Sequence, residues 1–378
     1  MKRLRPRWRL FLAVLTLALS AVLSGHAEAA ELRSFGQNIR ALGMGGVRLT
    51  TGEDAAVLLW NPAGLRLSEG MRLDIFNLGL GTNGYQNYQT FTQMGTIHGL
   101  EDLTPLYGKP FNVGVNGYAA MSFPNMGFAV FDEGWTDIKF NNPAFPELNV
   151  AYYNDYGYAL GGAFGVGPVS FGVSVKRITR SGGYKTIGAE MLDGFDTSTV
   201  TSMFTDEGVG YGLDLGVLLR APAPFNPTLS IAWQNVGHTE FQLSKGTITP
   251  PGIRDNVVLG ATIDGDVGLA GFAAGVEYRH VGLPGEQLGK KIHMGAELSL
   301  LNLDLRAGFY QGYTTYGVGL DLFLVQLDAA LYSAERGAYP GQTPDQRINV
   351  GLSASFGFDP DFNLISFGGK GRKLKQRR

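Results

Sequence analysis

The sequence of 378 residues contains no cysteine and only 5 histidines. Without cysteine there is no disulfide, no thiol nucleophile and no cysteine-ligated metal centre. The HExxH pattern of zinc proteases, the GxSxG pattern of serine hydrolases and the EF-hand pattern are all absent. We therefore expect no catalytic residue, no metal and no cofactor, and we do not expect an enzyme.

Long apolar runs are missing beyond the first 29 residues, so no transmembrane helix is expected there. The first 29 residues read as a signal peptide. They hold a basic stretch at Lys2–Arg9, an apolar stretch at Leu10–Leu23 and a small-residue cleavage site at Ala27–Ala29. The alternative is an uncleaved membrane anchor, for which the apolar stretch is short.

A basic excess is absent from the rest of the chain. The net charge is −2, and residues 1–29 carry +4 of it, which leaves −6 on the remainder. This charge argues against nucleic acid as a partner. Only the tail, residues 359–378, is basic. It is read either as a solvated end or as a contact for an anionic partner in the periplasm.

Glycine and aromatic residues are abundant, with 55 Gly, 16 Tyr and 23 Phe. Glycine is present at about twice its usual share, and the mean hydropathy is +0.00. An exported chain of this composition is typical of a transmembrane β-barrel, whose outer face is apolar and whose inner face is polar.

Alternation of apolar and polar residues predicts about fourteen strands, an even number, and a barrel over residues 71–358. The predicted strands are 71–80, 111–122, 126–138, 148–164, 168–180, 207–220, 226–236, 254–264, 267–280, 290–300, 302–311, 313–323, 325–334 and 346–358.

The two faces of each predicted strand differ in chemistry. Tyr211, Leu213 and Leu215 share one face, for example, and Gly212 and Asp214 share the other. Because a charge that faces lipid costs a few kcal/mol, the charged face is expected to point into the lumen. A soluble β-sandwich is the alternative, but its inner face would be apolar.

The links between predicted strands alternate between short and long, except at Gly312. Outer-membrane barrels have short periplasmic turns and long outer loops. Fourteen strands then place both termini in the periplasm of a diderm bacterium.

The two longest links, 81–110 and 181–206, carry apolar side chains that water should disfavour. Phe91, Met94, Phe195 and Phe204 are the candidate members of a hydrophobic capture surface. The alternative is that they pack together as a lid over the barrel mouth.

The stretch before the first strand, residues 30–70, reads as a compact hatch. Three glycines, Gly43, Gly45 and Gly46, allow tight backbone packing. A short apolar run follows the acidic residues Glu53 and Asp54 and is expected to end as a helix near Trp60, because Asn61-Pro62 comes next.

These residues resemble the N-terminal hatch of the FadL-like superfamily of long-chain fatty acid transporters, which includes a PorV/PorQ-like branch. The matching residues are Gly43, Gly45 and Gly46 in the glycine turn and Asn61, Pro62 and Ala63 in the hatch-tip motif. The resemblance implies an outer-membrane barrel that takes up small hydrophobic molecules, such as long-chain fatty acids, with membrane lipid around it.

Two other functions remain open at this point. A PorV-like barrel would act as a component or shuttle of a protein secretion system and bind a secretion-system protein. A third reading is a barrel with a purely structural role. Uptake predicts a continuous apolar cavity above the hatch, whereas the shuttle predicts a polar or sealed lumen.

His293 and Glu297 lie on one strand face and are expected to form a hydrogen-bonded pair rather than a metal site.

Overall fold

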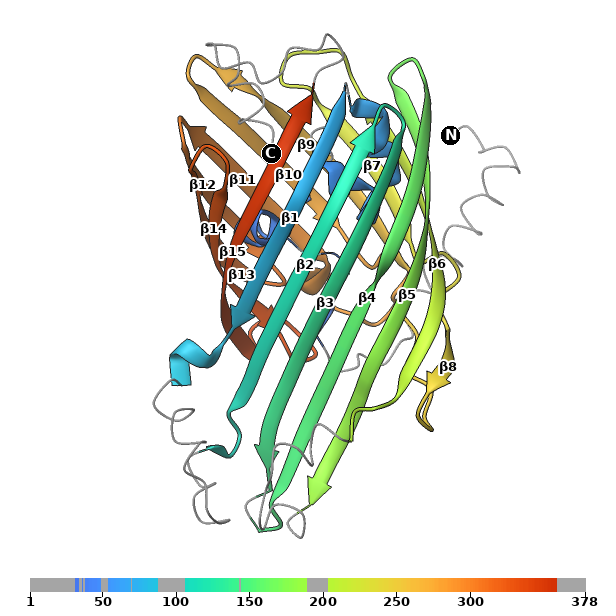
Figure 1. Ribbon diagram of the computed structural model, residues 1–378. Coiled ribbons are helices and arrows are strands. Elements are labelled where there is room, and N and C mark those ends of the chain that lie inside the picture. Colours follow the sequence, from blue (N-terminus) through green and yellow to red (C-terminus); the bar gives the residue numbers. More distant parts are fainter. Residues whose placement is uncertain are drawn as a thin grey trace, which may run out of the picture.

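The computed structural model describes residues 31–33, 36, 38–48, 54–68, 70–87, 106–142, 144–188 and 203–358. These residues form a closed antiparallel β-barrel around an N-terminal segment (Figure 1). The sheet closes because β5 pairs with β6 as well as with β4. Closure leaves no long unpaired edge, which a bilayer does not tolerate. No helix in the described part of the chain is long and apolar enough to cross a membrane.

The wall is built from strands in sequence order. They are β1 (Met71–Thr82), β2 (Pro110–Phe123), β3 (Met126–Asn141), β4 (Glu147–Val166), β5 (Val169–Gly188), β6 (Glu207–Arg220), β7 (Thr228–Gln234), β8 (Phe241–Lys245), β9 (Asn256–Val267), β10 (Ala270–Tyr278), β11 (Ile292–Leu300), β12 (Leu303–Tyr310), β13 (Tyr313–Asp321), β14 (Gln326–Glu335) and β15 (Pro344–Phe358). Short helices η3 (Gly84–Asn87) and α6 (Leu288–Lys291) lie in two of the links.

The fifteen strands occupy fourteen positions in the wall. Both β7 and β8 pair with β6, β7 along Leu215–Arg220 and β8 along Glu207–Gly210. They are therefore two parts of one interrupted strand. The predicted number of strands is confirmed, but the prediction of a plain link over 237–253 is wrong where it covers β8.

The predicted faces are also confirmed. On β6, Tyr211 is 73% exposed and Asp214 is fully buried. Large apolar side chains are exposed around the outside, whereas charged side chains such as Lys176 and Arg306 are buried inside. A soluble sandwich is excluded because the enclosed face carries the charges. The link predicted at 181–206 is shorter than expected, since β5 extends to Gly188.

The two ends of the barrel differ in their connections. At one end, the top in Figure 1, tight turns join the strands, and β1 begins and β15 ends there. We name it the short-turn end. The opposite end carries the links 83–109, 189–206 and 279–291, and we name it the long-loop end.

We expect the long-loop end to face the outside of the cell. Because the chain has no cysteine, a cysteine introduced by one substitution is the only thiol of the protein that can be labelled. Phe145→Cys, at a position 75% exposed in the β3–β4 link, should react with a membrane-impermeant maleimide on whole cells, whereas Leu269→Cys, at a position 67% exposed in the β9–β10 turn, should not. The opposite labelling pattern would show that the barrel has the opposite orientation in the membrane. As a control, both positions should react after the outer membrane is permeabilised.

Candidate functional site

The described parts of the N-terminal segment, residues 38–48 and 54–68, lie inside the barrel (Figure 1). Its helix α2 (Ile39–Gly43) contacts β12 to β15. The 3₁₀ helix η1 (Ala55–Leu59) contacts β1 to β4, and η2 (Pro62–Leu67) contacts β3 to β6. The segment therefore touches opposite parts of the wall. It therefore occupies part of the lumen.

Side-chain caps start the short helices of the segment. Asn38 Oδ1 accepts a hydrogen bond from the Ala41 N–H at 2.7 Å, and Asp54 Oδ1 accepts one from the Ala56 N–H at 2.9 Å. These bonds satisfy amide groups that a helix start leaves free. The predicted helix end near Trp60 is confirmed, although the helix is of the 3₁₀ type. Glu53 lies outside the described residues.

The glycine turn meets the wall backbone directly. Gly45 has a φ of +67°, and a Cβ at this position would lie 2.1 Å from Met294 O and 2.5 Å from Phe309 N. A Cβ on Gly43 would lie 2.9 Å from the Gly317 Cα. No side chain fits at these contacts, so glycine is required on the segment for both its φ and its volume.

The wall also carries glycines at this contact. Added Cβ atoms on Gly295 and Gly308 would lie 2.0 Å from Met44 O and 2.4 Å from Gly45 N. Glycine in a strand marks a close approach of another backbone. Alternation along β11 and β12 puts Gly295 and Gly308 on the lumen face, but nothing in the sequence connects them with the N-terminal turn.

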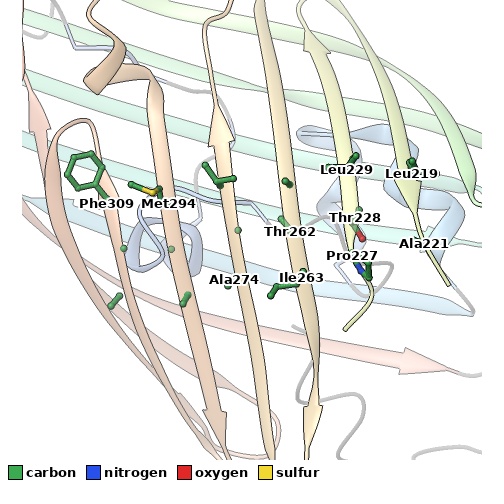
Figure 2. A pocket seen from close by; sticks show the side chains of 17 residues that line it. Leu219, Ala221, Pro227, Thr228, Leu229, Thr262, Ile263, Ala274, Met294 and Phe309 are labelled. Atoms are coloured by element: carbon green, nitrogen blue, oxygen red, sulfur yellow. The ribbon is translucent and has the colours of Figure 1, made fainter. Parts of the chain in front are cut away.

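The outer surface of the same wall carries an open apolar groove of about 770 Å³ (Figure 2). Leu229, Ile263 and Met294 line it and are 41–58% exposed on the outside. These side chains alternate with inward-facing ones, so the groove faces away from the lumen. It belongs to the lipid-facing surface rather than to the lumen site.

Hydrogen bonds hold the glycine turn in place. The Gly45 N–H donates to Thr315 Oγ1 at 2.9 Å, and the Thr315 hydroxyl donates to Gly43 O at 3.0 Å. His293 Nδ1 lies 2.9 Å from Gly45 O. The expected pairing of His293 with Glu297 is therefore wrong: each side chain contacts the N-terminal segment instead, because both point into the lumen and the segment fills the space between them and the axis.

The Asn61-Pro62-Ala63 motif packs against the opposite part of the wall. Asn61 Oδ1 accepts from the Ala63 N–H at 3.1 Å, which closes a tight turn at this motif. A Cβ on Gly172 of β5 would lie 2.2 Å from Ala63 N, and one on Gly216 of β6 would lie 2.1 Å from Asn61 Oδ1. At both ends of the segment, therefore, a turn packs against a glycine of the wall.

Apolar contacts and polar contacts both anchor the middle of the segment. Residues 55–60 and Leu65 form a buried cluster with wall side chains that include Phe131 and Ile178. Ser174 Oγ donates to Leu58 O at 3.1 Å, and Gln234 Nε2 donates to Trp60 O at 3.1 Å. The wall therefore supplies apolar surface and also satisfies backbone carbonyls of the segment.

Ion pairs surround α2 in the lumen. Arg40 pairs with Glu297 at 2.6 Å, and Arg306 pairs with Glu297 at 2.6 Å, with Asp328 at 2.5 Å and with Asp304 at 3.0 Å. The side chain of Arg306 is fully buried. A guanidinium in such a place needs several carboxylates to offset its lost hydration. The Lys176–Asp214 pair, at 2.9 Å, is equally buried.

A cavity of about 1240 Å³ opens in the lumen toward the long-loop end. Apolar side chains line part of it, among them Leu32, Trp135, Ile253 and Leu283. Charged residues line much of the rest: Glu31, Arg33, Glu133, Asp137, Lys139, Asp155, Arg180, Arg254, Asp255, Glu286 and Arg336. The cavity is thus amphipathic rather than continuously apolar, and its volume exceeds that of many small-molecule sites.

The start of the described chain lies against this cavity. Arg33 pairs with Asp137 at 2.6 Å and stacks over the Trp135 ring at 3.7 Å. Burial alone would raise the pKa of the Glu31 carboxyl, but the guanidinium groups of Arg33 and Arg347 hold it well below its usual range. Glu31 is therefore ionised, and the chain start is tied to the wall by charge.

The predicted capture residues are only partly described. Phe91, Met94 and Phe195 lie outside the described residues. Phe204 is half-buried, and its ring meets the Tyr152 ring edge to face at 5.7 Å. It packs on a cluster of Leu106, Phe140, Leu148, Val150 and Ile187 near the long-loop end. At this position the aromatic side chain packs against the wall.

Comparisons with models of protein families and with curated proteins returned no match. Among solved structures, the chain is similar to a deltaS2S3 mutant of TodX, a monoaromatic hydrocarbon channel, with a TM-score of 0.53 and 13% identity over 85% of this chain and 99% of that one. It is also similar to the toluene transporter TbuX of Ralstonia pickettii, with a TM-score of 0.50 and 12% identity over 85% and 98%. The chain has the fold of these outer-membrane channels.

Both channels are FadL-family outer-membrane barrels. The resemblance found in the N-terminal sequence is therefore confirmed at the level of the fold. Neither neighbour is an enzyme. An outer-membrane position agrees with the exposed apolar belt of the barrel and with the charges enclosed in its lumen.

The fit of the glycine turn predicts a local effect of Gly45→Ala. The new Cβ would meet wall backbone at 2.1 Å, so the segment should detach while the strands stay paired. We expect faster trypsin cleavage after Arg40 and Arg48 in detergent-purified protein, with the heat-modifiable barrel band retained on gels.

Gly268→Ala is the matched control. Gly268 has a φ of +63°, close to that of Gly45, but nothing lies within 4 Å of an added Cβ. Both variants carry the strain of a left-handed alanine, about 1–2 kcal/mol. Equal trypsin sensitivity in the two variants would show that backbone strain, and not the wall contact, decides the result.

Proposed function

We propose that the protein is a passive outer-membrane channel for small hydrophobic molecules, in which the N-terminal segment is a hatch that closes the lumen. The observation that carries the proposal is a lumen cavity of about 1240 Å³ at the long-loop end with the segment packed beyond it. Both termini then lie in the periplasm and the cavity opens to the outside. The known activities of TodX and TbuX, hydrocarbon and toluene transport, support this class of cargo.

The lining of the cavity restricts the chemical class of molecule that we propose as the cargo. A pure hydrocarbon would leave the charged lining unsolvated, which is costly. An amphipathic molecule places its tail on Leu32, Trp135 and Ile253 and its ionised head beside Arg33 or Arg336. A long-chain fatty acid has this chemistry. Capture at Phe204 and the neighbouring loops would come first, followed by entry into the cavity.

The attachment of the segment supports a gating role. It is held against the wall by hydrogen bonds, ion pairs and close packing, without a disulfide. Thr315 makes two hydrogen bonds with it and Gln234 makes one. Bonds of this kind contribute about 0.5–1.5 kcal/mol each, so they break and re-form reversibly. Opening would require the segment to leave both glycine contacts.

Phe204→Ser tests the capture surface. Burying one aromatic side chain against a lipid tail is worth about 1.5–3 kcal/mol, so the variant should bind a fluorescent fatty acid about tenfold more weakly or worse. The measurement is a fluorescence titration of detergent-purified, heat-modifiable protein.

Phe145→Ser is the matched control, because Phe145 is exposed at the same end of the barrel and lies outside the Phe204 cluster. Its affinity should equal that of the wild type. If the wild type shows no saturable binding of fatty acid or toluene, the uptake proposal fails.

A secretion role is the second candidate, and one observation favours it. The described residues form no continuous apolar path through the lumen, because charged residues line the cavity and the segment packs against the wall beyond it. A PorV-like component or shuttle would use the loop surface to bind a secretion-system protein. Deletion of the gene would then remove exported proteins from the medium, whereas an uptake channel would leave them unchanged.

A further inference from the structure

Three tight turns at the short-turn end hold a bulky apolar residue in a left-handed backbone conformation. Phe225 in the β6–β7 turn has a φ of +66°, Leu301 in the β11–β12 turn has a φ of +56° and Phe323 in the β13–β14 turn has a φ of +72°. Glycine and asparagine adopt this conformation readily, whereas leucine and phenylalanine do so at a cost. Turns that face water therefore favour the first two residue types at such positions.

The β11–β12 and β13–β14 turns also expose their apolar side chains. Leu301 is 66% exposed and Phe323 is 60% exposed. The two turns lie side by side, because the Asp321 N–H donates to Asn302 O at 2.9 Å. Exposed apolar surface of this extent marks a contact with another apolar phase or molecule. We name as the turn patch the exposed apolar residues of the two turns: Leu300, Leu301, Leu322, Phe323 and Leu324.

The turn patch continues the lipid-facing surface of the wall. On β13 the outward positions from Tyr316 to Leu322 are all aromatic or aliphatic, and the exposed Thr314 limits this band toward the long-loop end. Phe323 follows Tyr316 by seven positions, which corresponds to about 18 Å along the membrane normal at the usual rise and tilt of barrel strands. The apolar band of an outer-membrane barrel is about 25 Å tall. On this part of the wall the band reaches its usual height only if the turns lie within it.

The longer strand β4 places the edge of the apolar band at the same end. Tyr156 and Val166 are both exposed on the outward face, and Asn154 is the next outward position toward the long-loop end. Val166 follows Tyr156 by ten positions, or about 26 Å by the same measure. Val166 is the last residue of β4 before its short turn. A full apolar band therefore ends at the short turns and not before them.

The charge of the chain at this end fits a lipid surface. Strand β15 ends here at Phe358, and residues 370–378 contain six Lys and Arg residues and no acidic residue. Anionic lipid head groups attract basic segments that lie close to the membrane. Continuity with the lipid-facing wall and this charge both favour lipid over a protein as the molecule that covers the turn patch.

We propose that the turn patch is a lipid-binding surface, and that the β11–β12 and β13–β14 turns lie among the acyl chains of the leaflet at the short-turn end. Removal of the leucine and phenylalanine side chains from water offsets the cost of their left-handed backbone. The barrel then ends level with the bilayer at these turns instead of projecting into water. This surface depends neither on the cargo of the channel nor on movement of the N-terminal segment.

Fluorescence quenching of single-cysteine variants tests the proposal. Full-length Leu301→Cys and Leu324→Cys, each labelled with nitrobenzoxadiazole, are placed in vesicles of phosphatidylethanolamine and phosphatidylglycerol. A lipid with a nitroxide near the head of its acyl chain should quench both labels, as it should quench a label on Leu305→Cys in the lipid-facing wall. Iodide does not enter hydrocarbon, so its quenching constant should be about tenfold lower at both positions than at Phe145→Cys, which faces water at the long-loop end.

Asp266→Cys is the matched control at the short-turn end. In the β9–β10 turn Gly268 takes the positive-φ position and Asp266 is exposed, as in a turn that reaches water. With iodide on both sides of the vesicle, this label should be quenched as strongly as the label on Phe145→Cys. If iodide quenches the turn-patch labels equally well, the turns lie in water and the proposal is overturned. If neither quencher reaches them, the chain itself or a second copy covers the patch, which also overturns it.

Leu301→Asn gives an independent readout of stability. Asparagine adopts a positive φ more readily than leucine, so in a turn that faces water this change would raise the urea midpoint of unfolding. In lipid the loss of the apolar contact outweighs that gain, and we expect a lower midpoint in the same vesicles. Asp266→Asn should leave the midpoint unchanged. A higher midpoint for Leu301→Asn than for the wild type would contradict the proposal.

Discussion

Contact between the backbone of the N-terminal segment and the backbone of the wall is the constraint on which the rest of the structure depends. The segment approaches the wall most closely where the wall has glycine, at Met44 and Gly45 against Gly295 and Gly308 and at Ala63 against Gly172. Because the contacts lie on different parts of the wall, they fix both the position and the direction of the segment. The hydrogen bonds from Thr315, Ser174 and Gln234 then satisfy its carbonyl and amide groups.

Charge inside and apolar surface outside follow from the same closed sheet. Closure satisfies the wall backbone, so side chains alone decide what each face contacts. Inward positions carry Arg306, Glu297 and Lys176, whose ion pairs take the place of water around them. The lumen therefore holds buried ion pairs beside apolar clusters, and without cysteine it has no disulfide. The apolar residues of the segment meet the wall in one cluster around Phe131 and Ile178 and in another around Tyr310 and Tyr332.

Alternation was sufficient to predict the strands, their faces and the lumen charges, because lipid outside and polar groups inside leave a strict period of two. Gly308 and Gly317 were likewise visible as lumen-facing glycines. Their contact with the N-terminal turn could not be predicted, because that turn lies more than 250 residues earlier in the chain. Strand β8 was missed because Phe241–Lys245 offers only a short alternating pattern after the positive-φ residues Asn235 and His238.

The partners of individual charges were the least predictable feature. His293 and Glu297 share a strand face, and proximity along the strand predicted a pair between them. In the structure the N-terminal segment provides other partners: His293 contacts Gly45, and Glu297 pairs with Arg40. Asp54 was predicted correctly as a helix start, yet nothing in the sequence placed it beside Asp74. Such contacts depend on how a non-strand segment is threaded, for which a sequence period carries no information.

Conductance across a planar bilayer tests most directly whether the N-terminal segment closes the lumen. Purified wild-type barrel should insert and remain closed, whereas a variant that lacks residues 38–66 should insert as a heat-modifiable barrel and conduct steadily. Equal conductance of the two proteins would contradict the account, because the lumen would then be open beside the segment or sealed by another part of the chain.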